Sequence, residues 1–200
     1  MKKTILLSMI IICFSIFTKA QTVPVHFGID PGVALSKASY KPFSGDRRVW
    51  AGFDGGALVE IGGKILRFQG EVNLSMNGVE LNTGTSEWTI KNSYVNVPVL
   101  AKLKLKGISF LTGPQMDFLL SAKSDTSGSN SGSVDVKDQF KSSGFEWVFG
   151  SEIRITKEFF LGIRYTLGLT NISERLNFEM KNRYVSFRIG YMLDKLMKKK

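Results

Sequence analysis

The sequence predicts an all-β protein, an eight-stranded antiparallel up-and-down transmembrane β-barrel. Three observations predict it: apolar–polar alternation, a regular succession of short and long links, and an amino-terminal export leader. The clearest alternation covers Leu66–Met76, where Gly70 alone belongs to neither set. Because successive side chains of a strand point to opposite faces, this segment has one apolar face and one polar face.

Residues 1–20 are typical of a signal peptide, cleaved at about Ala20/Gln21, and residues 21–200 form the predicted outer-membrane barrel domain. Two lysines precede an apolar run over Ile5–Phe17. That run is shorter than the roughly 20 residues a spanning helix needs, although an uncleaved anchor is an alternative. Cys13, the only cysteine, lies inside the run, so the mature chain offers no thiol for a disulfide, nucleophile or metal site.

The chain is basic, with a formal charge of +10. Its Lys and Arg residues are spread singly through alternating segments, and the only run is Lys198–Lys200. No basic helix and no aromatic–basic motif accompanies them, so we expect no nucleic-acid partner.

Eight segments carry the alternation, and each is long enough to cross a bilayer as a tilted strand of roughly 9–11 residues. In chain order the predicted strands are Phe27–Leu35, Trp50–Ile61, Lys64–Met76, Ser93–Leu105, Ile108–Ser121, Gly144–Ile155, Glu158–Leu169 and Arg183–Leu193. Pro98 lies within the fourth, where its missing N–H predicts a bulge or kink.

The links between these strands alternate in length. Hairpin turns are predicted at Gly62–Gly63, Lys106–Gly107 and Thr156–Lys157, with glycine supplying a positive φ in the first two. The remaining links are long: Ser36–Val49, Asn77–Asn92, Ala122–Ser143 and Thr170–Asn182. One end of the barrel should therefore carry tight turns and both termini, and the other end long loops. The polar segment Ser124–Ser133 is expected to be a mobile loop.

Two patterns assign the faces. Glycines fall in the polar set, where a narrow lumen needs room: Gly28, Gly32, Gly56, Gly113, Gly150, Gly162, Gly168 and Gly190. Aromatic residues of the apolar set gather near strand ends, as in two interfacial girdles: Phe53, Phe118, Phe145 and Trp147, then Phe27, Phe110, Phe159 and Tyr191. The apolar face should thus point outward; a soluble, lipocalin-like ligand-binding barrel, with its apolar face inward, is the alternative.

Charged residues of both signs then line the predicted lumen. They are Glu60, Arg67, Glu71, Lys102, Lys104, Asp117, Glu146, Glu152, Arg154, Arg164 and Arg188. Eight strands leave barely enough width for their own side chains, so these charges should pair in a structural network. A narrow channel or proton path is the functional alternative.

No catalytic, cofactor-binding or metal-ligating residues are predicted. His26 is the only histidine and begins the first strand, away from the long loops where a barrel enzyme would place its triad. Asp125, Asp135 and Asp138 lack the alternate-position spacing of a calcium loop. An outer-membrane lipid hydrolase, acyltransferase or protease remains the enzymatic alternative.

Three stretches resemble the PorT-like outer-membrane barrels of Bacteroidota, a group of small OmpA-like eight-stranded barrels. YVNVPVLAKLKL at Tyr94–Leu105 is similar to a family strand with proline and lysine, GPQMDFLLSA at Gly113–Ala122 to its Gly-Pro strand, and GIRYTLGLTNI at Gly162–Ile172 to its Arg-Tyr strand. The resemblance implies a role in secretion or maturation of surface proteins.

We therefore expect a non-enzymatic scaffold or accessory protein of the bacterial outer membrane. Its partners would be outer-membrane lipid and periplasmic or surface proteins, and it would be a monomer without a cofactor.

Overall fold

A computed structural model describes residues 24–36, 39–41, 47–82, 87–127, 132–174 and 179–194, and nearly all of them lie in strands. The predicted signal peptide, Cys13 and Lys198–Lys200 lie outside the described residues. Among the described residues, no helix is long and apolar enough to cross a membrane.

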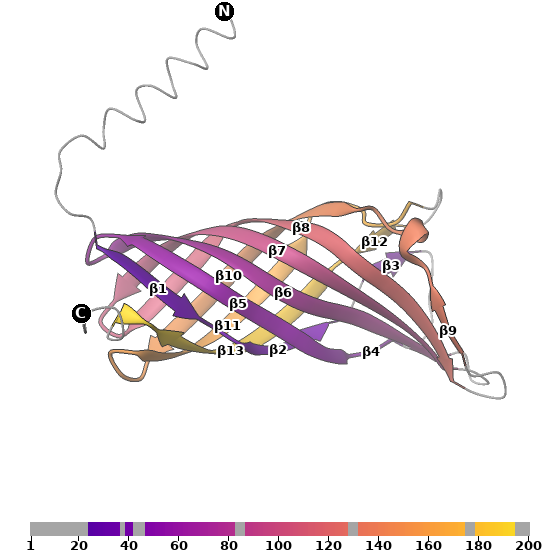
Figure 1. The fold of residues 1–200 in the computed structure, drawn as a ribbon, viewed down its shortest axis with the longest axis horizontal. Helices are drawn as coiled ribbons and strands as arrows, with labels where there is room; N and C mark the ends of the chain where they lie inside the picture. Colours follow the sequence, from indigo (N-terminus) through magenta and orange to yellow (C-terminus); the bar gives the residue numbers. More distant parts are fainter. Residues whose placement is uncertain are drawn as a thin grey trace, which may run out of the picture.

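Eight strand positions form a closed antiparallel ring (Figure 1). The first position is divided between β1 (Val25–Ile29) and β2 (Gly32–Ser36). The others are β5 (Trp50–Gly62), β6 (Leu66–Asn82), β7 (Glu87–Leu105), β8 (Ile108–Ser127), β10 (Ser143–Arg154), β11 (Phe159–Gly168) and β13 (Arg183–Met192). The eight predicted strands are therefore confirmed, with shifted ends.

The ring closes between the first and last strands. β1 pairs with β13 at Gly28↔Met192, and β2 pairs with β13 at Gly32↔Arg188. The break at Asp30 and Pro31 follows from the missing N–H of proline. The broken segment still forms hydrogen bonds with both neighbouring strands. Asp30 N donates to the carbonyl of Gly56 on β5 (3.0 Å), and Ile189 N on β13 donates to the carbonyl of Pro31 (2.9 Å).

Tight turns occupy one end, as predicted. They span residues 63–65, 106–107 and 155–158. Gly62 (φ +146°), Lys106 (φ +39°) and Gly107 (φ +96°) have positive φ. Positive φ at both central residues gives the twist that suits a two-residue hairpin.

Replacing Gly107 by valine should lower the free energy of unfolding by about 1–3 kcal/mol, because a β-branched residue is strained at this φ. Urea unfolding in detergent would measure the change. Gly63→Ala is the matched control, since φ is not positive there and a Cβ would lie 3.8 Å from its nearest neighbour. Equal stability of Gly107→Val and the parent would contradict the turn geometry.

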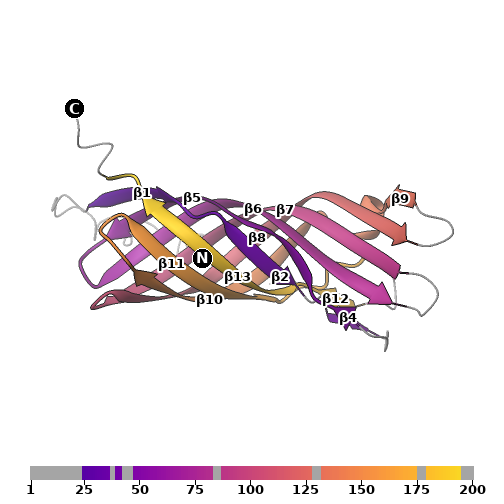
Figure 2. The ribbon, with the colours of Figure 1, turned by 90° about the horizontal axis from the view of Figure 1, so that it is seen from below.

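At the other end the structure departs from the predicted loops. β6, β7 and β8 continue far beyond their neighbours and project as a sheet (Figures 1 and 2). β9 (Gly132–Asp135) pairs with β8, and β4 (Arg47–Arg48) pairs with β6. Most of Asn77–Asn92 and six of the ten residues of Ser124–Ser133 therefore form strands, so the prediction of irregular loops is wrong there. Residues 83–86 and 128–131 lie outside the described part.

Smaller elements complete this end. β3 (Ser39–Lys41) pairs with β12 (Glu179–Lys181), and the short 3-10 helix η2 (Lys137–Gln139) follows β9. Phe140, next to η2, forms an isolated bridge with Ser173. The link that follows β8 and the link that follows β11 thus meet at this end of the barrel.

Pro98 causes neither a bulge nor a register change, so the predicted bulge is wrong at this position. The ladders are interrupted beside it, but Gly70↔Val99 and Asn73↔Asn96 keep one register. The bulge lies closer to the long-hairpin end, where Ser93 pairs with Ser121 while Tyr94 pairs with Leu119. Leu120 is therefore the extra residue, on β8.

The two faces have the predicted orientation. Phe68 and Val72 are each 59 % exposed on the outside of β6, whereas Gln69 and Glu71 are buried inside. The lumen is crowded: a Cβ on Gly190 would lie 1.9 Å from Cζ of Phe160. An outward apolar face excludes the soluble, lipocalin-like alternative.

Candidate functional site

The predicted lumen charges all lie on the inner face, and most of them meet in two clusters. The cluster nearer the turns surrounds the fully buried Lys102 of β7. Its ammonium pairs with Glu60 (Nζ–Oε1 2.5 Å) and Glu152, and donates to Gln69 Oε1 (3.0 Å). It also lies 5.3 Å from the centroid of the Phe160 ring, a cation–π geometry. The Lys102 charge is thus satisfied from four sides.

Arg67 of β6 extends this cluster. Its Nη1 lies 2.7 Å from Glu60 Oε2, and its Nε donates to the carbonyl of Gly63 (3.1 Å). Glu60 therefore bridges two cations on two different strands, β6 and β7. Two contacts join this turn-end layer to the middle of the lumen: Arg164 Nη2 lies 3.4 Å from Glu152 Oε1, and Gln69 Nε2 donates to Glu71 Oε1 (2.5 Å).

The second cluster lies at the middle of the lumen and centres on two arginines. Arg164 of β11 pairs with Glu71 (2.7 Å) and Asp30 (3.0 Å), and Arg188 of β13 pairs with Asp54 (2.7 Å), Asp30 (2.9 Å) and Glu71 (3.2 Å). All five side chains are buried. Five stretches of the ring are joined at one point, because each residue comes from a different strand or from the break in the first strand.

The two remaining predicted carboxylates, Asp117 and Glu146, are bound by an uncharged donor, the side-chain amide of Gln115. Gln115 Nε2 donates to Asp117 Oδ1 and to Glu146 Oε2, both at 2.9 Å, and lies 3.2 Å from the hydroxyl of Tyr184. Within the described part of the chain, no ion pair to Lys or Arg is present at Asp117 or Glu146. The structure therefore does not join these two predicted residues to the ion-pair network.

Lys104 and Arg154 also stay outside the ion-pair network. Both are half-buried toward the turn end. Arg154 Nη1 donates to the carbonyl of Lys157 (3.1 Å), so it stabilises the turn that follows β10.

The sequence analysis did not identify two members of the network, Asp30 and Asp54. Asp30 and Asp54 share the phase of the inward glycines, so the alternation did contain their signal. Apolar residues in that same phase also enter the lumen and form layers between the polar clusters. These layers comprise Leu58, Phe160 and Met192 near the turns, and Leu100, Leu111 and Val148 farther along.

The mouth at the long-hairpin end is covered by apolar side chains. One cluster contains Tyr94, Leu119 and Ala122, with Val136 and Phe140 packed on it, and the other contains Val79, Ile172 and Met180. Backbone hydrogen bonds stabilise this cover. Lys141 N donates to the carbonyl of Ile172 (2.8 Å), and Ile172 N donates to that of Met180 (2.9 Å). The lumen is thus packed with side chains and capped.

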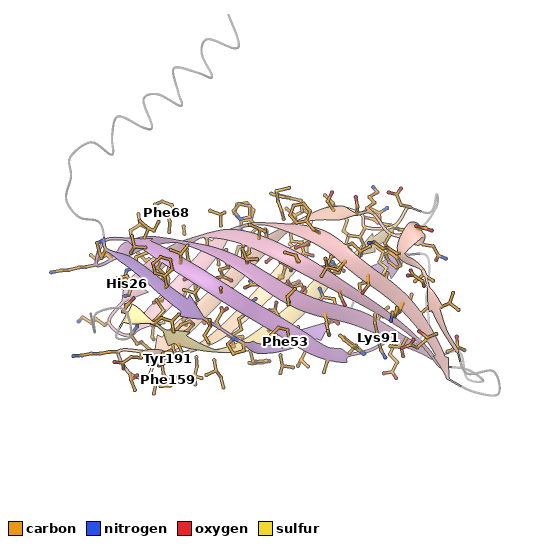
Figure 3. The ribbon with its side chains drawn as sticks, viewed as in Figure 1. His26, Phe53, Phe68, Lys91, Phe159 and Tyr191 are labelled. Carbon is orange, nitrogen blue, oxygen red and sulfur yellow. The ribbon has the colours of Figure 1, made fainter. Side chains whose placement is uncertain are left out.

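His26 lies at the turn end of β1, on the opposite side of the barrel from the capped mouth (Figure 3). Its Nδ1 is 2.5 Å from Asp194 Oδ2, which ties the start of the first strand to the end of the last. Among the described residues, no group of three or more His, Cys, Asp or Glu side chains has the geometry of a metal site.

Comparison with protein families shows to which family of proteins the chain belongs. The outer membrane protein beta-barrel domain family matches residues 19–174. The chain belongs to this family. As a member, it resides in the bacterial outer membrane. The exposed apolar face of this outer-membrane barrel is consequently its lipid-facing surface.

One solved outer-membrane protein shows the same fold, and two others are less similar. Ail, the attachment invasion locus protein of Yersinia pestis, solved with the heparin analogue sucrose octasulfate, is 14% identical with a TM-score of 0.51, over 84% of this chain and 98% of that chain. Neisserial surface protein A is 15% identical with a TM-score of 0.49, over 83% and 95% of the two chains. OprG of Pseudomonas aeruginosa is 10% identical with a TM-score of 0.44, over 85% and 96%. No curated protein matches the sequence significantly.

Some aromatic side chains of this outer-membrane barrel lie near the turn end of the lipid-facing surface and others lie toward the long-hairpin end. Phe159 and Tyr191 pair at the turn end, with ring centroids 4.8 Å apart, and Phe53 lies toward the other end (Figure 3). Amphipathic and aromatic rings at these depths anchor a barrel in the interfaces of its bilayer.

Proposed function

We propose that this outer-membrane barrel is a non-enzymatic scaffold with a closed lumen, whose projecting sheet engages a protein partner. The observation that carries the proposal is the continuation of β6, β7 and β8 beyond the ring while the lumen stays filled. A filled lumen leaves the hairpins as the surface available for recognition. The loop-outward orientation usual in such barrels would place this sheet at the cell surface.

The PorT-like resemblance supplies the finer part of the proposal, assistance in the secretion or maturation of surface proteins. The sheet suits this role because β9 and the hairpin ends present backbone groups at strand edges, which other chains readily pair with. The single His26, held by Asp194 at the turn end, supports a role without catalysis.

A shortened hairpin tests the proposal. Val79 and Ile90 are cross-strand neighbours, so an Asn-Gly turn replacing residues 80–89 should rejoin them without disturbing the ring. We expect the shortened protein to keep its heat-modifiable migration, and cells carrying it to lose both crosslinked partner and surface-protein export. Unchanged crosslinking and export would contradict the hairpin as the recognition surface.

Conductance separates the scaffold from the narrow channel. The packed layers predict no ion conductance in planar bilayers, since an eight-stranded lumen is filled by its own side chains. A steady conductance that disappeared in Glu71→Gln or Arg164→Gln would contradict the closed lumen. Both residues lie in the central cluster, so any ion crossing the lumen would meet them.

A further inference from the structure

A hollow of about 400 Å³ opens on the outer surface of the barrel, across β1, β5, β6 and β7. Two small residues make room for it. Gly70 has no side chain, and Ala57, its diagonal neighbour across the β5–β6 ladder, has only a methyl group. The other outward side chains that line the hollow are apolar and larger: Phe27, Val59, Val72, Val97 and Val99. The hollow is therefore part of the lipid-facing surface.

The strand register explains the shape of the hollow. One cross-strand row runs through it, in the order Phe27, Val59, Gly70 and Val99. The missing side chain of Gly70 leaves a gap in this row. Leu58, Glu71 and Pro98 are buried with their side chains on the lumen side, so they contribute backbone to the floor of the hollow. The β6–β7 ladder is interrupted beside Pro98, which has no N–H to donate.

The walls of the hollow are stiff. Four of the lining residues are valines, and a valine has a single side-chain torsion with few favoured rotamers. The hollow is thus formed before anything enters it, and filling it costs the protein little conformational entropy. If it stayed unfilled, its walls would lose dispersion contacts on one side.

The depth of the hollow in the membrane restricts its occupant. Gly70 and Val72 are the middle outward positions of Leu66–Met76, and Val72 is 59 % exposed. At this depth the bilayer consists of hydrocarbon. Phe27, which also lines the hollow, follows His26 at the turn end (Figure 3). The hollow therefore extends from the middle of the bilayer toward the short turns, which usually face the periplasm.

We propose that this hollow binds one acyl chain of a phospholipid from the periplasmic leaflet, as a discrete site within the lipid-facing surface. The valine walls contact the chain from several sides, so it makes more heavy-atom contacts here than on a flat strand surface. In a bilayer, such packing takes the place of the hydrophobic effect as the driving force for association. The site depends on the outer wall of the barrel and not on the scaffold role.

The affinity is tested by native mass spectrometry of the full-length mature protein in detergent, titrated with phosphatidylethanolamine. Ala57→Leu places a larger side chain in the hollow. It should weaken binding of the first lipid about tenfold, since losing on the order of ten atom contacts has an effect of that size. Ala51→Leu is the matched control, because Ala51 is an exposed, outward residue of the same strand and does not line the hollow.

Gly70→Leu fills the hollow from β6 and should weaken binding to a similar extent. Its heat-modifiable migration should match that of the parent, which separates loss of the site from loss of the fold. Phosphatidylethanolamine with a diazirine on one acyl chain gives the location: its adducts in the parent should concentrate on residues 57–59 and 97–99.

The proposal is overturned if Ala57→Leu binds phosphatidylethanolamine like the parent, or if Ala51→Leu loses as much affinity. Adducts spread evenly over the lipid-facing surface would also overturn it. A second copy of the chain is the competing occupant. Val97→Cys forming disulfide-linked dimers faster than Ala51→Cys would assign the hollow to a dimer interface, and this too would overturn the proposal.

Discussion

Replacing Arg188 by methionine is expected to lower the free energy of unfolding of the barrel by about 3–5 kcal/mol. Arg188 contacts Asp30, Asp54 and Glu71 in the middle of the lumen. Methionine preserves much of the volume but leaves Asp30 and Glu71 with Arg164 alone and removes the arginine that pairs with Asp54. Removing one partner of a buried ion pair is strongly destabilising, because the remaining charge stays desolvated without compensation. Urea unfolding in detergent micelles would measure the loss.

Two further variants make this result specific. Lys181→Met removes an ion pair with Glu179 at the surface and should change stability by no more than about 0.5 kcal/mol. Adding Asp54→Asn to Arg188→Met removes one of the stranded charges and should recover part of the loss. If Arg188→Met unfolds at the same urea concentration as Lys181→Met, the central cluster does not stabilise the barrel.

Gly190→Leu is expected to produce the second large loss, about 1–3 kcal/mol or more. A Cβ at this position would lie 1.9 Å from Phe160, whose ring fills the lumen between Leu58 and Met192 and lies beneath Lys102. The ring cannot move aside without disturbing these neighbours. The variant should therefore migrate as unfolded protein at lower temperature in heat-modification gels.

The outward glycine of β6 provides a matched control. Gly70→Leu adds the same side chain in a strand, but its Cβ would meet only Val59 Cγ1 at 3.7 Å. We expect Gly70→Leu to be neutral or stabilising, and Phe160→Ala to rescue part of the Gly190→Leu loss by opening space. Equal losses at positions 70 and 190 would contradict the inward crowding.

Strand number, turn positions and face assignment were predictable because each depends on a local rule. Alternation in Leu66–Met76 specifies two faces, and Gly107 supplies the φ its turn requires. The projecting sheet was not predictable, because polar segments such as Ser124–Ser127 become strands only by pairing with β7. The bulge at Leu120 likewise depends on how β7 and β8 align, and neither strand alone specifies it.

In the candidate site, too, the sequence predicted the features that follow local rules and missed those that depend on the closed ring. Alternation identified which charges face inward, yet it could not say that Arg164 and Arg188 meet at Asp30, because ring curvature decides which inward residues touch. Leu58 and Phe160 occupy alternate positions that are otherwise polar, so the apolar–polar alternation did not predict the apolar layer that they form in the lumen. Pairing across the lumen requires the closed ring.

The joining of β13 to the first strand has a consequence for biogenesis. A ring that closes between its two terminal strands cannot be completed until the whole chain has been delivered to the membrane, and such long-range pairing is slow. Until then both edges carry unpaired backbone groups. Arg188 arrives on the last strand, whereas Asp30 and Asp54 arrive early. Docking of β13 therefore brings the arginine that pairs with Asp54, and a second arginine for Asp30, in the same step that closes the ring.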